Sequence, residues 1–152
     1  MKEANLLLSC LALAFVGLVV MQSFKNRDTN VTKDHLQPSA LEASIQRGSV
    51  IYEGFCARCH MPSGEGVKSA FPPLAQSDYL LEKREESIRA VKYGQRGEIV
   101  VNGVTYNSIM SPMGLTNEEV ADVMNYILNS WGNKSDAMVT VEEVAKVKKQ
   151  TE

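Results

Sequence analysis

Cysteine and histidine are both scarce in this chain of 152 residues, which contains three cysteines and two histidines. Three cysteines are too few for a disulfide-rich scaffold. An excess of one charge is also lacking, because 16 Lys and Arg face 18 Asp and Glu, for a formal net charge of −2. The sequence pI of about 5.8 argues against a non-specific nucleic-acid binder.

The overall composition is close to the average for globular proteins, with 44% apolar and 22% charged residues. Such a composition argues against a disordered chain, a collagen and a membrane protein with several spans. The average conceals an uneven distribution, because an uncharged apolar run near the N-terminus precedes a mixed remainder with many loops.

Residues 4–24 are uncharged and predominantly apolar, with Lys2 before them and Lys25 and Arg27 after them. A helix of this length spans about 30 Å, the thickness of the hydrocarbon layer of a bilayer. We therefore expect one transmembrane anchor, preceded by a cytoplasmic end at residues 1–3. The flanking positive charges nearly balance, so they leave the orientation of the anchor open.

Two other processing routes compete with an uncleaved anchor. A cleaved signal peptide has a shorter apolar core and ends at small residues, whereas this run is long and ends in Met21-Gln22-Ser23-Phe24. A lipoprotein would be modified at Cys10, which follows Leu7-Leu8-Ser9. Cleavage before Cys10 would leave an apolar stretch behind the modified cysteine, so the uncleaved anchor is the favoured interpretation.

The rest of the chain divides into a tether, a domain and a tail. Residues 25–40 are polar, contain a proline and lack an apolar period, which is typical of a flexible tether. Residues 41–133 form the domain, and their 8 basic and 11 acidic residues give it a charge of −3. Residues 134–152 form a C-terminal tail, in which Thr140 to Glu143 fit the capping box of a short helix. A domain of this size buries only a modest core, which favours an added cofactor or metal.

Three helices and one hairpin are expected in the domain. Apolar or small residues at helical spacing predict a helix over residues 41–55. A second helix covers about residues 84–93 and ends at Gly94. The third helix, over residues 116–131, begins with a capping box. Residues 99–106 place Asn-Gly between two β-type runs, a strong hairpin signal. The predicted fold class is therefore all-α with a small β-hairpin.

The candidate chemistry lies in Cys56-Ala57-Arg58-Cys59-His60. The pattern C-x-x-C-H is the attachment signature of a c-type haem. Two cysteines about one helical turn apart can reach the two vinyl groups on one edge of a porphyrin. The histidine that follows is directed at the iron as its proximal ligand.

Two other uses of this motif are less suited to its surroundings. A thioredoxin-like redox pair follows a strand and opens a helix in an α/β fold, whereas Cys56 follows a helical pattern. A zinc site needs four ligands, and beyond this motif the domain has no Cys or His, because His35 lies in the tether and Cys10 in the anchor. Haem attachment is the favoured interpretation.

A second axial ligand has to come from a methionine, because the domain has no other histidine. Met110 and Met113 lie in one loop just before the third predicted helix. Met61 is too close to His60 to reach the other haem face, and Met124 falls on an apolar helix stripe typical of a core residue. The residues alone leave Met110 and Met113 as alternatives.

Residues 41 to about 145 resemble the class I cytochromes c of bacteria. They are especially similar to the small mono-haem domains that occur alone or fused to copper nitrite reductases. The resemblance implies the cytochrome c fold, with about three to five helices around one covalently attached haem c. The matching segments occur in family order: GSVIYEGFCARCHMPSGEG, FPPLAQSDYL, VKYGQRGEIVVNGVTYNSIMSPMG and LTNEEVADVMNYILNSWGN.

The resemblance assigns roles to the residues of the haem centre. Cys56 and Cys59 match the thioether cysteines, and His60 matches the proximal iron ligand. Pro73 matches the proline whose carbonyl accepts the Nδ1 hydrogen of that histidine. Met110 matches the distal iron ligand, although the family proline comes one residue later here.

The resemblance also assigns residues around the haem centre. Gly48 and Tyr126 match the crossing of the first and last helices, which explains a glycine inside a predicted helix. Tyr106, Asn107 and Trp131 match positions near the haem edge and propionates, although ordinary packing explains each of them equally well.

An iron bound by both His60 and Met110 has no open position for a substrate, so we expect a one-electron carrier with no catalytic residues. The expected partners are membrane respiratory complexes or a reductase or oxidase, met through an apolar contact or a basic patch on the partner. No nucleic acid or small-molecule substrate is expected. The resemblance implies haem attachment outside the cytoplasmic membrane, hence a single-pass protein whose domain faces the periplasm or the cell exterior.

Two other functions stay open. The protein could be a fixed haem subunit of an oxidase or reductase complex. Alternatively, a labile methionine would open the iron to small ligands, as in a sensor or a peroxidase. The absence of a second His or an Arg in the loop that carries Met110 argues against the second alternative.

Overall fold

The computed structural model describes residues 39–135 and 137–150. The predicted anchor of residues 4–24 and nearly all of the predicted tether lie outside these ranges. Among the described residues, no helix combines the length and the apolar character that a membrane span requires.

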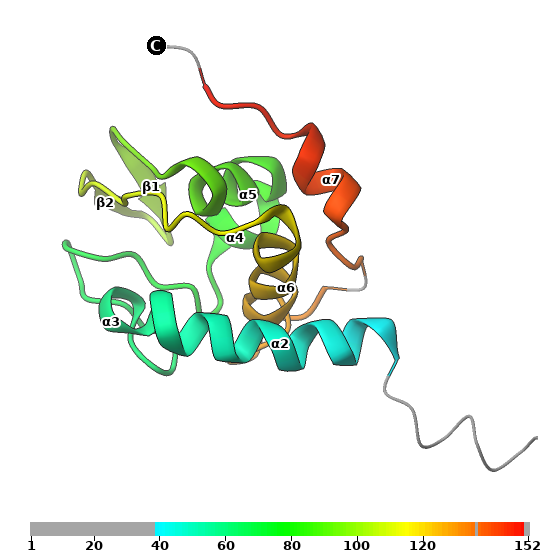
Figure 1. Cartoon of the computed structure of the whole chain (residues 1–152). Helices are drawn as coiled ribbons and strands as arrows, with labels where there is room; N and C mark the ends of the chain where they lie inside the picture. Colours follow the sequence, from blue (N-terminus) through cyan, green and yellow to red (C-terminus); the bar gives the residue numbers. More distant parts are fainter. Residues whose placement is uncertain (1–38, 136, 151–152) are drawn as a thin grey trace, which may run out of the picture. The chain divides into compact units, whose positions relative to one another are not determined.

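Helices dominate the described part of the chain, and one small hairpin interrupts them, which confirms the predicted class (Figure 1). Two short helices, α3 and α4, were not predicted. In chain order the elements are α2 (Ala40–Phe55), α3 (Ala57–His60), α4 (Asp78–Glu82), α5 (Arg84–Tyr93), β1 (Ile99–Val101), β2 (Val104–Tyr106), α6 (Asn117–Ile127) and α7 (Val141–Lys146).

The helix ends follow from local side-chain chemistry. Ser39 and Thr116 each form a capping box, with Glu42 and Glu119 respectively, at the start of α2 and α6. Gly94 ends α5 with a φ of 83°, a conformation that favours glycine. The predicted starts of the first and third helices and the predicted end of the second are therefore confirmed within a residue or two.

The hairpin is built as its sequence predicts. Ile99 pairs with Tyr106 and Val101 with Val104, which leaves a two-residue turn. Asn102 and Gly103 both have positive φ, 48° and 74°, as a type I′ turn requires.

Helix α2 crosses α6 at Gly48, where the two backbones touch. A Cβ atom on Gly48 would lie 2.0 Å from the carbonyl oxygen of Asp122 and 2.8 Å from the Cβ of Tyr126. The predicted crossing of Gly48 and Tyr126 is confirmed, and it explains a glycine that would otherwise weaken the helix.

A buried carboxylate on α6 binds α2 beside this crossing. The Asp122 carboxylate on α6 accepts hydrogen bonds from Nε and Nη2 of Arg47, both at 2.7 Å, and from the hydroxyl of Ser44 at 2.6 Å. Asn125 continues the network by donating to Ser44 Oγ at 2.9 Å. A charge-assisted, two-point contact of this kind has a strict geometry, so it sets the register of α2 against α6.

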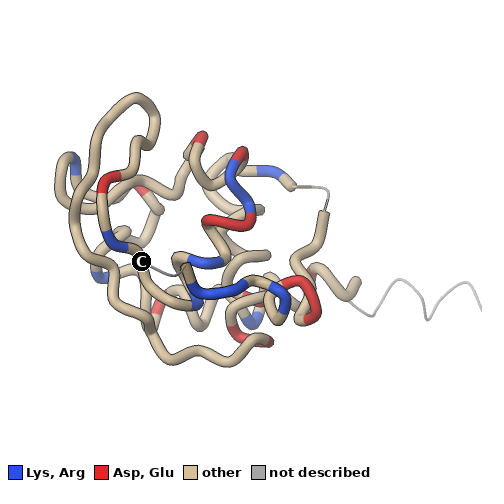
Figure 2. The backbone as a smooth tube through the Cα atoms, turned by 90° about the horizontal axis from the view of Figure 1, so that it is seen from above, with Lys and Arg blue, Asp and Glu red and all other residues tan. Residues whose placement is uncertain are grey.

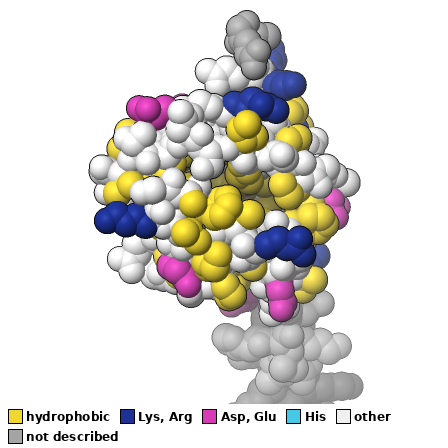
Figure 3. Space-filling view, turned by 90° about the vertical axis from the view of Figure 1, so that its left-hand side faces the viewer, with side chains coloured by type: hydrophobic (Ala, Val, Ile, Leu, Met, Phe, Trp, Pro, Cys, Tyr) yellow, Lys and Arg dark blue, Asp and Glu magenta, His cyan; other side chains and the backbone are white. Residues whose placement is uncertain are grey.

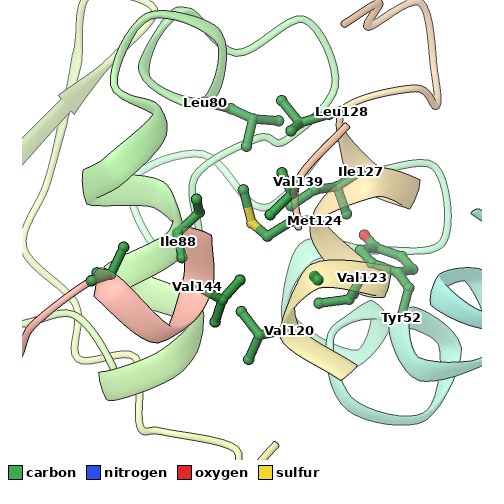
Figure 4. Close-up of a cluster of buried hydrophobic side chains, with 12 residues drawn as sticks. Tyr52, Leu80, Ile88, Val120, Val123, Met124, Ile127, Leu128, Val139 and Val144 are labelled. Carbon is green, nitrogen blue, oxygen red and sulfur yellow. The ribbon is translucent and has the colours of Figure 1, made fainter. Parts of the chain in front are cut away.

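The apolar core forms where α6, α5 and the C-terminal tail meet (Figure 4). Met124 is fully buried in it, as its helical position predicts. Side chains from α6 fill the centre, and Ile88 of α5 and Val139 and Val144 of the tail close it. The α6 members are Val120, Ala121, Val123, Met124 and Ile127.

The tail packs against the domain instead of extending from it. Val139 exchanges two hydrogen bonds with the Asn125 side chain, at 2.7 and 2.9 Å. Arg84 of α5 donates two hydrogen bonds to the Glu143 carboxylate of α7, at 2.6 and 2.9 Å. The Thr140 hydroxyl caps α7 by accepting from the Glu143 N–H at 3.2 Å, and the Glu143 carboxylate pairs with Arg84.

The ion pair of the tail makes stability depend on pH. Hydrogen bonding from Arg84 lowers the pKa of Glu143 from its ordinary value of 4.5, and burial partly opposes this. A carboxylate whose pKa is lower in the folded state stabilises the fold above its ordinary pKa and loses that contribution as the pH falls through the folded pKa. We expect Glu143→Gln to lower the free energy of unfolding at pH 7, by an amount that shrinks below about pH 4.5.

Urea unfolding at a series of pH values measures this difference. In an Arg84→Met background the same Glu143→Gln substitution is expected to have an effect that changes much less with pH, because Arg84 is the largest cause of the lowered pKa of Glu143. An equal pH dependence in both backgrounds would mean that another group causes it.

Candidate functional site

The cysteine motif consists of Cys56, which follows α2, and the single turn of helix that forms α3. Cys56 joins the two helices, and its backbone N–H donates to the Tyr52 carbonyl at 2.8 Å. The His60 N–H donates to the Cys56 carbonyl at 2.9 Å, which closes the turn. Cys56 and Cys59 are half-buried and make no disulfide. Both thiols are therefore free to form bonds to a cofactor.

Burial shifts the pKa values of His60 and Cys56. Burial lowers the pKa of His60, and the hydrogen bond to a backbone carbonyl only partly opposes this, so the ring is neutral at pH 7. Burial also raises the pKa of the Cys56 thiol to about 11. At pH 7 His60 is thus a neutral imidazole and Cys56 a protonated thiol. Cys56 therefore differs from the low-pKa cysteine of a thiol oxidoreductase.

A backbone carbonyl orients the His60 ring. His60 Nδ1 lies 2.9 Å from the carbonyl oxygen of Pro72. A carbonyl can only accept a hydrogen bond, so Nδ1 carries the proton and the lone pair of Nε2 is free to bind a metal. The structure thus gives His60 the tautomer that a ligand needs.

The predicted partner of His60 was wrong by one residue, because Pro72 accepts the hydrogen bond and not Pro73. The loop geometry explains this. The N–H groups of Leu74 and Ala75 both donate to the Gly64 carbonyl, at 2.7 and 2.9 Å, which fixes the turn after the two prolines. A Cβ on Gly66 would lie 2.6 Å from the Pro72 oxygen, so glycine is needed for this close approach.

An apolar cavity lies beside the motif, and its wall comes from most of the described elements. Figure 3 shows hydrophobic side chains gathered around a hollow on one face of the molecule. His60, Cys56 and Cys59 lie on this wall, as do Met110 and Met113. Other wall residues are mainly apolar, among them Phe71, Pro73, Leu74, Leu80, Val91, Ile99, Val101, Tyr106, Val123 and Ile127. An imidazole and a thioether sulfur can bind the iron of a haem, and two thiols can attach its vinyl groups. With the apolar space around them, these residues fit a covalently attached haem.

Met110 is held much more firmly than its loop neighbours. Its backbone forms an isolated bridge with Gln95, in which the two N–H···O bonds measure 2.9 and 3.0 Å. Gly94 permits this contact, because a Cβ there would lie 2.5 Å from the Met110 oxygen. Met113 also lines the cavity but has no such bridge. The fixed backbone favours Met110 as the ligand.

Of the three residues predicted to lie near the haem edge, one lines the cavity and two do not. Tyr106 lies on β2 and lines the cavity. Asn107 and Trp131 are not among the described residues that line the cavity. Trp131 instead packs with Tyr52 and Tyr126, with ring centroids 4.8 and 5.4 Å away.

This aromatic cluster supports the loop that follows His60. The Tyr52 hydroxyl donates to the Met61 carbonyl at 2.7 Å. Met61 has a φ of 65°, which is unfavourable for a residue with a side chain and persists only where surrounding contacts hold it. Trp131 fills the space beside Gly64, where a Cβ would lie 2.5 Å from its ring. The cluster therefore fixes the loop from outside the cavity.

Sequence reasoning missed several residues of the site. Gln95 is the most important, because it holds Met110 through backbone bonds that any residue type could make. Phe55 and Ile109 line the cavity and are 50% and 60% exposed, which places them at its rim. An exposed apolar residue at a loop or helix end carries no sequence signal of its own.

Comparison with known proteins gives a consistent result. The family model for cytochrome c matches residues 45–131. Cytochrome c-552 of Thermus thermophilus is 40% identical over 110 residues, which cover 66% of this chain and 83% of that protein.

Parts of larger proteins are similar as well. The cytochrome c subunit of the quinone alcohol dehydrogenase of Gluconacetobacter polyoxogenes is 31% identical over 105 residues, or 66% of this chain and 22% of that subunit. The cytochrome c subunit of gluconate 2-dehydrogenase of Pantoea cypripedii is 32% identical over 107 residues, or 68% of this chain and 24% of that subunit.

Proposed function

Because the chain belongs to the cytochrome c family, whose cofactor is a covalently attached haem c, we propose that it is a membrane-anchored, one-electron carrier of a bacterial respiratory chain. Cys56 and Cys59 would hold the haem, and His60 and Met110 would bind its iron. When bound, the haem iron supplies a one-electron redox couple. The observation that supports this best is that a neutral, oriented His60 and a backbone-fixed Met110 line one apolar cavity.

The protein residues set the properties of this couple. Pro72 fixes the His60 ring and raises its basicity through the hydrogen bond to Nδ1. The Met110 thioether is neutral, so it favours the ferrous state and raises the reduction potential. The apolar wall excludes water from the site. With His60 and Met110 both bound to the iron, no coordination position would be left for a substrate, which fits an electron-transfer protein and not an enzyme.

The rim of the cavity is the expected contact for redox partners. Phe55 and Ile109 are exposed apolar side chains there. Acidic and basic residues are interspersed along the helices (Figure 2), so one-sign electrostatic docking is not favoured. Small, transient contacts are typical of redox partners. We propose that membrane respiratory complexes, a reductase or an oxidase make brief apolar contacts at this rim.

The proposed location is the bacterial cytoplasmic membrane, with the domain in the periplasm or on the cell exterior. The uncharged run of residues 4–24 supports an anchor. If this is correct, the haem-containing protein should stay in the membrane fraction after a high-salt wash and should be digested by protease added to spheroplasts. Recovery of a shortened, haem-containing chain in the periplasmic extract would overturn the anchor and favour cleavage.

A fixed haem subunit of a larger enzyme is the second candidate. The similarity to cytochrome c subunits of alcohol and gluconate dehydrogenases favours it. Mild detergent extraction followed by affinity purification distinguishes the two. A stoichiometric catalytic subunit in the purified material would support the fixed subunit, whereas a single haem-containing chain would support the mobile carrier.

The absorption spectrum of the full-length, haem-loaded protein tests the proposed function. We expect the oxidised protein to show the weak long-wavelength band of methionine sulfur bound to ferric haem. We also expect the reduced protein to leave carbon monoxide unbound at neutral pH. A high-spin spectrum without this band, together with carbon monoxide binding, would favour a sensor or peroxidase. A chain without attached haem would contradict the central claim.

A further inference from the structure

The last turn of α5 contacts two segments that are distant in sequence, the loop that carries Met110 and the C-terminal tail. In Figure 1, α5 lies between the hairpin and α7. Residues 107–115 contain no helix or strand. Within this stretch, Met110 forms a backbone bridge with Gln95. The position of Met110 therefore depends on how firmly the end of α5 is held.

The tail holds this end of α5 through backbone carbonyls. Lys92 Nζ donates to the Val144 carbonyl at 2.7 Å and lies 3.4 Å from the Val147 carbonyl. The Tyr93 hydroxyl donates to the same Val147 carbonyl at 3.2 Å. These carbonyls lie at the C-terminal end of α7, where the helix dipole favours a positive charge.

The tail is itself fixed, so it can serve as an anchor. The side chains of Val144 and Val147 are 0% and 5% exposed and belong to the core. Arg84 attaches the other end of the tail helix through Glu143. Lys92 and Tyr93 are followed directly by Gly94 and Gln95, which contact Met110. The contacts thus run in series from the core through the tail and α5 to Met110.

We propose that Lys92 and Tyr93 are positioning residues that hold Met110 on the iron by fixing the last turn of α5 to the tail. This inference rests on the proposed function, in which Met110 is the axial ligand. Neither side chain lines the cavity, so each acts through Gln95 and the backbone bridge. Without these contacts to the tail, the end of α5 moves more and Met110 leaves the iron more often. An external ligand then competes more successfully with Met110 for the iron.

Imidazole binding to the oxidised, full-length, haem-loaded protein measures how firmly Met110 is held. The apparent affinity of the competing ligand rises with the fraction of protein in which Met110 is off the iron. We expect Lys92→Met to bind imidazole about tenfold more tightly, which corresponds to loss of about 1.4 kcal/mol of Met110 attachment. Lys92→Arg keeps a charged donor, so it should restore most of the original affinity.

Arg84→Met is the matched control, because it removes another charged contact between α5 and the tail but lies at the far end of α5. We expect it to lower stability without changing imidazole affinity. Equal tightening in Arg84→Met and Lys92→Met, or unchanged affinity in Lys92→Met, would overturn the inference. These outcomes leave the methionine band of the unmodified protein intact. If the unmodified protein lacked that band, the proposed function and this inference would both be overturned.

Discussion

Met110→Ala is expected to abolish the long-wavelength band of the oxidised protein and to lower its reduction potential. Alanine has no donor atom, so the iron loses a ligand that favours the ferrous state. Axial ligands set haem potentials over roughly 0.8 V, and we expect a fall on the order of 0.2 V. An absorption spectrum and a redox titration of the haem-loaded variant measure both effects. The variant should also bind carbon monoxide when reduced.

Met113→Ala is the matched control, since Met113 lines the same cavity three residues later. It should keep the band and should change the potential only slightly. The expectation rests on the Gln95 bridge, which fixes the backbone of Met110. Retention of the band in Met110→Ala and its loss in Met113→Ala would show that Met113 is the ligand.

Elements that carry their own local signals could be predicted from the sequence. The capping box at Thr116, the C-terminal Gly94 and the Asn102-Gly103 turn each satisfy backbone groups within a few residues, so no distant contact is needed to specify them. Helices α3 and α4 have four and five residues. That is too short for a helical period to show, and only the Ser77 cap marks the start of α4.

The haem centre was predictable to the extent that it is local. Cys56, Cys59 and His60 lie within one motif, so their roles could be predicted from spacing alone. The carbonyl partner of His60 depends on how the following loop folds back, and two adjacent prolines gave no means to choose between Pro72 and Pro73. Such backbone-to-side-chain contacts have no residue signature at the accepting position.

Long-range contacts account for most of what the sequence did not predict. The bridge of Gln95 to Met110 uses only backbone atoms. The packing of Trp131 against Tyr52 joins residues from opposite ends of the domain. Gly48 is the exception, because a glycine within a strong helical pattern is itself a signal of close approach. Its long-range contact could therefore be predicted and can be tested directly.

Gly48→Ala is expected to reduce the free energy of unfolding by at least about 3 kcal/mol. The added methyl group would lie 2.0 Å from a backbone oxygen of α6, and a backbone cannot rotate away as a side chain can. The helices must separate, which also disturbs the pairing of the buried Asp122 with Arg47. Overpacking of a core costs about 1–3 kcal/mol and occasionally more, out of a typical total of about 5–15 kcal/mol. Urea unfolding followed by helical circular dichroism measures the loss.

Gly54→Ala, on the same helix, is the matched control. A Cβ at Gly54 would have no atom within 4 Å, so alanine there should only remove the entropic cost of a helical glycine. We expect it to raise the free energy of unfolding by about 0.5–1 kcal/mol. The two substitutions are chemically identical, so their opposite signs isolate the contact between α2 and α6. If Gly48→Ala were as stabilising as Gly54→Ala, the two helices could not cross as closely as described.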